Sequence, residues 1–238
     1  MKNQSLVLYS KFDNETGFDY IKPNNTEVGI RNSTQLVDTF DGPFSNPDSS
    51  YSTNTLFSIG IWLGYFKMSP EIDLTSFTLG FYLRVTGSEF VGIYRDWHDP
   101  GYRFTLTAAN LDLELHIHNS SISWRTDPSY KDTITSFTFR NVFKAFEWQF
   151  VALTYDGARR QLKLYDETAN VKDEYANVQI DQASTNEIGI GASFRFSDWK
   201  YFPRSSAIAC FSLHNKGLPQ MDIALLPCAC QLKDRQYK

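Results

Sequence analysis

Two short segments hold the side chains best suited to chemistry. Asp96-Trp97-His98-Asp99 places two carboxylates three residues apart, where a turn can bring them together, and carboxylate oxygens are ligands that Ca²⁺ prefers. Trp97 and Trp199 each stand close to an aspartate, and sugar sites combine an aromatic plane with a few polar groups. We predict ligand binding at Trp97, His98 and Trp199, with calcium as a candidate cofactor at Asp96 and Asp99. The alternative is that the acids only form turns and the tryptophans only cap the edges of the fold.

The sequence offers no residues on which to base catalysis. It contains no Gly-x-Ser-x-Gly elbow, phosphate loop or paired-histidine metalloprotease motif. Glu71-Ile72-Asp73 comes nearest to a pair of catalytic carboxylates, but Pro70 precedes it and no second glutamate follows. Asp166-Glu167 and Asp173-Glu174 are adjacent pairs, which point to opposite faces when they lie in a strand. We therefore predict that the protein is not an enzyme.

Three cysteines lie near the C-terminus. Cys210 falls in a strand-like run, and Cys228 and Cys230 follow the last apolar segment. A bridge from Cys210 to either Cys228 or Cys230 would tie the final strand to the end of the chain and leave one thiol over. The alternative is three free cytosolic thiols. A zinc site is not expected, since His214 has no second histidine at ligand spacing.

Acceptor sequences for N-glycosylation, Asn-x-Ser/Thr, crowd the start of the chain. They occur at Asn3, Asn14, Asn24 and Asn32, and once more at Asn119. Together with the cysteines, they indicate an extracellular or cell-surface protein, glycosylated at Asn14, Asn24, Asn32 and Asn119.

Composition and net charge exclude several classes of protein. The 238 residues include 27 acidic and 23 basic ones, for a net charge of −4, and 42% of the chain is hydrophobic. These values exclude a polybasic nucleic-acid binder and a disordered tail, and there is no apolar run of about 18 residues to insert into a membrane. No secretory signal precedes the first strand-like stretch, so we expect either a cytosolic protein or a segment of a longer secreted or membrane-tethered chain.

Apolar residues alternate with polar ones through much of the chain. Residues 77–85 and 111–117 follow period 2, typical of half-buried strands, which leaves His116 and His118 in solvent. Asp156-Gly157 separates two further runs and predicts a hairpin in which Asp-Gly supplies a positive φ. That pattern also places Trp148 in the core. Other strand candidates cover residues 6–12, 35–40, 61–68, 89–94, 102–107, 133–139, 171–178, 187–194 and 206–214.

Such numerous strands without amphipathic helices must pair antiparallel in a sandwich or barrel. We predict an all-β, antiparallel two-sheet jelly-roll sandwich with one short C-terminal helical turn at residues 218–226, where Pro219 suits the first turn. Residues 18–32 and 41–55 are expected to be surface loops. One domain should span residues 1–230, followed by a tail at 231–238.

Five segments in order resemble the laminin G-like and pentraxin-like jelly rolls of the concanavalin A-like lectin/glucanase superfamily. They are Leu6-Val7-Leu8-Tyr9-Ser10-Lys11-Phe12-Asp13, Ser76-Phe77-Thr78-Leu79, the hairpin around Asp156-Gly157, Ile188-Gly189-Ile190-Gly191, and Ala207 to Phe211 with the Gly217 turn. Two segments depart from the family pattern. The turn after Tyr165-Asp166 reads Glu167-Thr168 where glycine is usual, and Phe202-Pro203-Arg204-Ser205 stands where the family usually has Phe-x-Gly.

The resemblance implies a function in recognition. Laminin G-like modules often place an acidic calcium ligand before the closing strand, which corresponds to Asp198, whereas His118-Asn119 stands where a second acid is usual. We expect an extracellular recognition or adhesion module that binds a glycan or a protein through loops at the rim of the sandwich, with or without calcium. The alternatives are a glycan-processing enzyme of the same superfamily, which would need two carboxylates on one cleft face, and a purely structural ectodomain.

Overall fold

Strands dominate the part of the chain that the computed structural model describes, which is residues 5–10, 26–29, 64–87, 90–98, 101–118, 134–180, 184–190, 192–195, 198–201 and 206–229. The strands are β1 (Leu6–Ser10), β2 (Thr26–Gly29), β3 (Gly64–Asp73), β4 (Phe77–Arg84), β5 (Phe90–His98), β6 (Gly101–Ala109), β7 (Asp112–His118), β8 (Ile134–Phe139), β9 (Trp148–Asp156), β10 (Gln161–Tyr165), β11 (Val171–Tyr175), β12 (Ser184–Ile190), β13 (Ala192–Arg195), β14 (Asp198–Tyr201) and β15 (Ala207–His214). Two short helices follow, α1 (Gln220–Ile223) and α2 (Leu226–Ala229).

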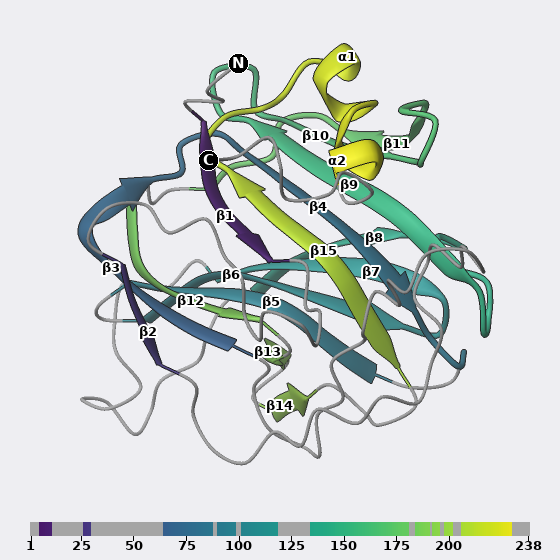
Figure 1. The fold of residues 1–238 in the computed structure, drawn as a ribbon, viewed down its shortest axis with the longest axis horizontal. Coiled ribbons are helices and arrows are strands. Elements are labelled where there is room, and N and C mark those ends of the chain that lie inside the picture. Colours follow the sequence, from purple (N-terminus) through teal and green to yellow (C-terminus); the bar gives the residue numbers. More distant parts are fainter. Residues whose placement is uncertain are drawn as a thin grey trace, which may run out of the picture.

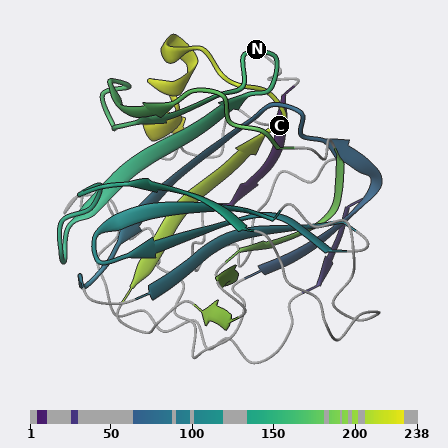
Figure 2. The same cartoon turned by 180° about the vertical axis from the view of Figure 1, so that it is seen from behind.

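The strands form two large antiparallel sheets packed face to face, which confirms the predicted sandwich (Figure 1). One sheet has the order β1-β15-β4-β9-β10-β11, and the other has the order β2-β3-β12-β5-β6-β7-β8. The β13–β14 hairpin contacts β5 and β6 and lies on the side of the seven-stranded sheet that faces away from its partner (Figures 1 and 2). None of the described helices is long and apolar enough to span a membrane.

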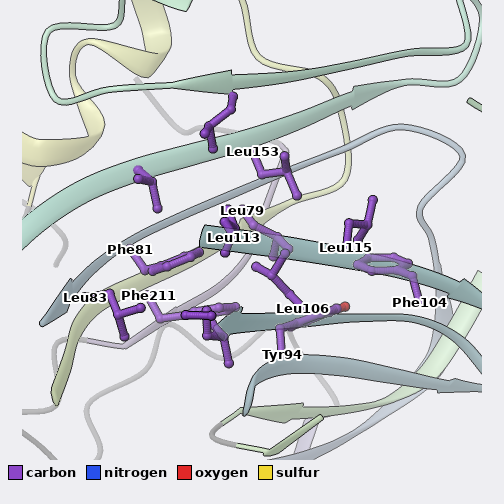
Figure 3. Packing of buried hydrophobic residues seen from close by; sticks show 14 of the residues in the cluster. Leu79, Phe81, Leu83, Tyr94, Phe104, Leu106, Leu113, Leu115, Leu153 and Phe211 are labelled. Carbon is purple, nitrogen blue, oxygen red and sulfur yellow. The ribbon is translucent and has the colours of Figure 1, made fainter. Parts of the chain in front are cut away.

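Aromatic rings connect the two sheets through the core. Phe77 of the six-stranded sheet stacks on Phe104 of the other at a centroid distance of 4.6 Å. Tyr94 stacks on Phe104 at 5.2 Å and on Phe211 at 6.0 Å, and Phe211 in turn faces Phe81 at 6.2 Å. All five rings are completely buried, and leucines of both sheets surround them (Figure 3). Stacked aromatic pairs are worth about 0.5–1.5 kcal/mol beyond the area they bury.

The outer face of the six-stranded sheet is also partly buried, contrary to the prediction of half-buried strands. Residues 218–229 fold over it, so that nearly all of β4 is buried on both faces. The Thr78 hydroxyl donates to the Lys216 carbonyl at 2.9 Å and accepts from the Leu218 amide at 2.9 Å. A Cβ atom at Gly80 would lie 3.0 Å from a Leu226 methyl group, so glycine there leaves room for the helical cover. Pro219 is the N-cap of α1 and not part of its first turn.

The predicted β9–β10 hairpin is confirmed, but its glycine serves another purpose. Asp156 pairs with Gln161, and the positive φ, 52°, falls on Arg160. A Cβ atom on Gly157 would overlap the Thr75 carbonyl oxygen, so glycine is required for close packing against the β3–β4 turn. The expectation that Asp-Gly supplies the positive φ was therefore wrong.

The turn after β10 replaces the usual glycine with a carboxylate. One oxygen of Asp166 accepts the amides of Thr168 and Asn170, each at 3.0 Å, and the Thr168 hydroxyl at 2.7 Å. Although partial burial opposes ionisation, these hydrogen bonds hold the pKa of Asp166 below its ordinary value. Ala169 adopts the positive φ, 59°, that a glycine would otherwise take.

Two strands were missed. Residues 26–29 form β2 inside a predicted loop, and residues 198–201 form β14. Both are only four residues long and show no alternation long enough to recognise. The predicted strand at 35–40, the predicted loop at 41–55 and the predicted tail lie outside the described residues.

His214 is buried at the end of β15, where its Nδ1 lies 3.4 Å from the Ser5 hydroxyl. Burial, with Lys216 nearby, lowers the pKa of its imidazole to about 4. An unfolded chain with an ordinary histidine pKa of about 6.5 binds more protons than the folded one between those two values, so stability falls as pH drops through this window.

We expect the free energy of unfolding to fall by roughly 2 kcal/mol between pH 7 and pH 5 on account of His214 alone. His214→Gln removes the titrating group, so its urea midpoint should change less over this range than that of the wild type. Urea unfolding at both pH values measures the difference. Equal changes in the two proteins would show that His214 is not the responsible group.

Candidate functional site

Three connections meet at one end of the sandwich and form a rim. They are the segment after β4, the β6–β7 turn, and the long β8–β9 loop that crosses from one sheet to the other. The Phe143 amide donates to the Leu111 carbonyl at 2.9 Å, and the Phe146 amide donates to the Val85 carbonyl at 2.7 Å. The crossing loop is therefore fastened to a neighbour from each sheet.

Phe146, in this loop, is held in an unusual conformation. Its φ is 64°, and its side chain is 62% exposed. A left-handed backbone at a bulky residue costs about 1–3 kcal/mol and persists only where surrounding contacts enforce it. Leu111, Ala169 and Cys210 adopt the same backbone conformation, but among the described apolar residues that do so only Phe146 is exposed, which makes its ring a candidate contact residue.

A cation and a second aromatic residue accompany Phe146. Arg84 donates from Nε to the Phe146 carbonyl at 3.1 Å, and its guanidinium carbon lies 5.9 Å from the centroid of the Phe146 ring. Trp148 stands opposite Arg84 in the β4–β9 register and is half-buried against the outer-face cluster. We call Arg84, Phe146 and Trp148 the rim patch. It presents aromatic surface and guanidinium donors together, as ligands with both apolar and polar faces require.

The neighbouring pair of outer-face residues, Tyr82 and Phe150, packs beside the rim patch. Tyr82 pairs with Phe150 in the register, and their rings lie 5.2 Å apart. The Tyr82 hydroxyl donates to a carboxylate oxygen of Glu167 at 2.9 Å. Burial and this hydrogen bond both raise the pKa of Tyr82, so the phenol stays protonated and holds the β10–β11 turn against β4.

Trp148 was predicted to lie in the core, and this was wrong. It lies on the outer face of the six-stranded sheet, at the margin of the cover formed by residues 218–229. The strand alternation was correct, but it assigned the wrong face, because Val151 and Leu153 are the β9 residues that face the other sheet.

The predicted ligand residues are only partly described. Trp97 and His98 end β5, where they pair with Tyr102 and Gly101. Trp199 and Asp198 lie in β14, whose hairpin contacts β5. Thus the structure places the two predicted segments on neighbouring elements, but the side chains of these four residues, and all of Asp99, lie outside the described residues.

Asp96 has a role that the sequence did not indicate. It is completely buried, and its Oδ1 accepts the amide of Phe104 at 2.9 Å where the β5–β6 register shifts. The carboxylate thus serves a backbone donor inside the sheet pair. No group of three acidic, histidine or cysteine residues suited to a metal occurs among the residues described.

His116 is buried, which corrects the expectation that it is solvated. Its Nδ1 lies 2.9 Å from the Ser136 hydroxyl, and its Nε2 lies 3.3 Å from a carboxylate oxygen of Glu114. Catalytic serine–histidine–carboxylate triads face the serine with Nε2 and the acid with Nδ1, so this arrangement is reversed.

The chain is similar in fold to several solved structures. No family model matches the chain, and no curated protein matches it. The receptor-binding domain of botulinum neurotoxin D has a TM-score of 0.63 and 14% identity, covering 94% of this chain and 52% of its own. The serotype D ligand-binding domain in complex with N-acetylneuraminic acid gives 0.63 and 14%, covering 94% and 51%. The neurotoxin DC binding domain in complex with rat synaptotagmin II gives 0.61 and 15%, covering 97% and 53%.

The likeness shows the fold. This chain spans about half the length of the receptor-binding domains it matches. The match therefore does not show that the corresponding half of those domains is the part that binds their ligands. At this level of identity, function has to be argued from the site itself.

Sequence reasoning missed the rim patch for a clear reason. A positive φ is usually signalled by glycine or asparagine, and Phe146 is neither. The available signal was an aromatic residue two positions before Trp148.

The cysteines are in different states. Cys210 is buried and disulfide-bonded, and it adopts a φ of 56° where the β15–β4 register shifts. Cys228 is exposed and free, whereas Cys230 lies outside the described residues. With Cys228 free, we expect Cys210 to pair with Cys230, which stays a prediction.

In protein made in an oxidising compartment, we therefore expect one free thiol per chain under denaturing, non-reducing conditions. Alkylation followed by tandem mass spectrometry should place the label on Cys228, and Cys228→Ser should have no free thiol. A bridge closing about 20 residues is worth roughly 3 kcal/mol in the chain-entropy model. A label on Cys230, or on all three cysteines, would contradict this pairing.

Proposed function

We propose that this protein is a non-catalytic recognition module that binds a glycan at the rim patch. The observation that carries the proposal is Phe146, an exposed aromatic ring held in a costly backbone conformation above a guanidinium group. Selection for stability alone would favour glycine or asparagine at such a position, because both adopt a positive φ more readily.

The chemistry of the rim patch suits a sugar. The C–H face of a pyranose packs on an aromatic plane, and its hydroxyl or carboxylate groups accept hydrogen bonds from a guanidinium. Lys144 and Glu147 form an exposed ion pair at 3.5 Å in the same loop, which adds polar groups next to the ring. The N-acetylneuraminic acid complex of a structural neighbour is consistent with a glycan ligand in this fold.

The carboxylates of the described residues support a role without catalysis. Asp73 accepts the Thr75 amide at 2.8 Å, Asp112 accepts the Asn141 amide at 2.7 Å, and Asp166 organises its own turn. Each of these acids serves a nearby backbone donor. The structural neighbours are named as receptor-binding domains, which agrees with a binding function.

A protein ligand is the second candidate. Met221 and Leu225, four residues apart in the C-terminal cover, are 80% and 63% exposed and offer apolar side chains to a partner. The synaptotagmin complex of a structural neighbour agrees with this reading.

We further propose that the module is extracellular, that it belongs with the laminin G-like jelly rolls, and that residues 1–230 form its single domain. The glycosylation acceptors and the bridged Cys210 support the first point. Calcium, if it contributes, has Asp99 and Asp198 as its candidate ligands, because the buried Asp96 carboxylate already accepts a backbone amide. Glycan binding measured with and without EDTA tests the calcium proposal.

We expect Phe146→Asn to weaken glycan binding at least tenfold, because the stacking plane is lost, while asparagine tolerates the positive φ and preserves the fold. A glycan array with the wild type identifies the sugar, and calorimetry with that sugar measures the loss. Met221→Ala is the matched control, since it removes an exposed apolar side chain elsewhere and should leave affinity unchanged.

Arg84→Gln should weaken binding of the same sugar without lowering the melting temperature by more than a few degrees. Two results would overturn the proposal: an array on which the wild type binds no glycan, or a Phe146→Asn protein that binds as the wild type does. Loss of a protein ligand in the Met221→Ala control would instead support the second candidate.

A further inference from the structure

A cavity of about 220 Å³ lies where the two sheets end on the same side of the sandwich. β8 is the last strand of the seven-stranded sheet and β11 the last of the six-stranded sheet. The cavity opens between them and is lined by residues 138–142, Leu164, Lys172, Asp173 and Tyr175. It is separate from the rim patch, since none of the three rim-patch residues lines it.

Tyr175 makes the inner wall of this cavity rigid. Its hydroxyl donates to the Thr138 carbonyl at 2.6 Å, which joins the two edge strands directly. Its ring meets Phe137 and Phe139 edge-on at 5.1 and 5.2 Å. Burial and the nearby Asp173 raise the pKa of Tyr175, so the phenol remains a donor at neutral pH. The cavity is therefore preformed, and binding a ligand costs little conformational entropy for ordering its walls.

Two cations line the cavity. Arg140 and Lys172 are exposed, and neither makes a hydrogen bond or an ion pair through its side chain with any residue in the described part of the chain. Two cations on neighbouring elements are paired: Lys163 of β10 lies 3.5 Å from Glu174, and Arg159 of the β9–β10 turn lies 3.6 Å from Asp156.

Asp173 is the only carboxylate that lines the cavity, and its Oδ1 accepts the Glu174 amide at 2.8 Å. Counting Arg140 and Lys172 against Asp173, the lining carries a net charge of +1. Such a charge suits a single negative group and not a dense polyanion.

We propose that this cavity binds one oxyanion group, a carboxylate or a sulfate, carried on a ligand about the size of one sugar ring. Arg140 and Lys172 supply the charge. Arginine holds a planar oxyanion with two parallel N–H donors, while lysine acts as a compact point charge beside it. The volume equals that of about seven water molecules, which is room for one pyranose but not for a chain of them. This proposal does not depend on the rim patch.

Glucuronic acid and glucose test the proposal, because they share a ring and differ in the carboxylate. In an NMR titration, glucuronic acid should shift the amides of residues 138–142 and 172–175, whereas glucose should not. Inorganic sulfate is the second probe. Shifts with both anions identify the oxyanion as the recognised group, and shifts with glucuronic acid alone identify a carboxylated sugar.

Variants locate the site by charge. Arg140→Gln and Lys172→Gln should each weaken glucuronic acid binding at least fivefold, and Asp173→Asn should strengthen it by raising the net charge of the lining. Lys163→Gln removes the same charge from a paired lysine outside the cavity and should have little effect. All four positions are at least partly exposed, so the fold should survive each change.

Three results would overturn the proposal: no shift with either anion, equal shifts with glucose, or an equal loss in Lys163→Gln, which would mean that overall charge alone is responsible. A failure here leaves the rim-patch proposal standing, because that proposal is tested with Phe146→Asn and a different ligand.

Discussion

The stack of five aromatic rings between the sheets is the constraint on which the other features depend. Phe77, Phe81 and Phe211 come from the six-stranded sheet, and Tyr94 and Phe104 come from the seven-stranded one, each ring within about 6 Å of the next. Because these rings occupy the inner face of every strand they belong to, they decide which residues of β4, β5, β6 and β15 point outwards. The outer faces, the rim loops and the cavity between the edge strands are consequences of that choice.

The outer faces then differ in how they are covered. Residues 218–229 bury part of the outer face of the six-stranded sheet, and the cover ends near Arg84 and Trp148. On the other sheet, Thr105, Thr107 and His116 point away from the core and are nevertheless buried, and the β13–β14 hairpin contacts this face at β5 and β6. Hence the alternation of a strand divides its residues between two faces, but it does not reveal which face meets the partner sheet or what covers the other one.

This difference explains how much the sequence could predict. Period-2 alternation and the Asp156-Gly157 turn were enough to predict most strands, the antiparallel sandwich and the C-terminal helical segment, since these patterns are local. The same reasoning assigned Trp148 to the wrong face of β9 and left His116 in solvent, because local alternation does not show which side of a strand is covered. Local patterns also gave no sign of the roles of Phe146 and Asp96. Phe146 combines a positive φ with a hydrogen bond to the distant Val85, and Asp96 accepts the backbone amide of Phe104 on the neighbouring strand.

Both proposed sites depend on one connection. The β8–β9 loop begins at the cavity, with Arg140, and ends at the rim patch, with Phe146. It is fastened between them by the bond from Phe143 to Leu111, and at its end by the bond from Phe146 to Val85. A loop that joins two sheets cannot shift at one end without disturbing the other when both ends are hydrogen-bonded to strands or turns. The sandwich therefore presents the two proposed sites on one connection that is hydrogen-bonded to a neighbour from each sheet.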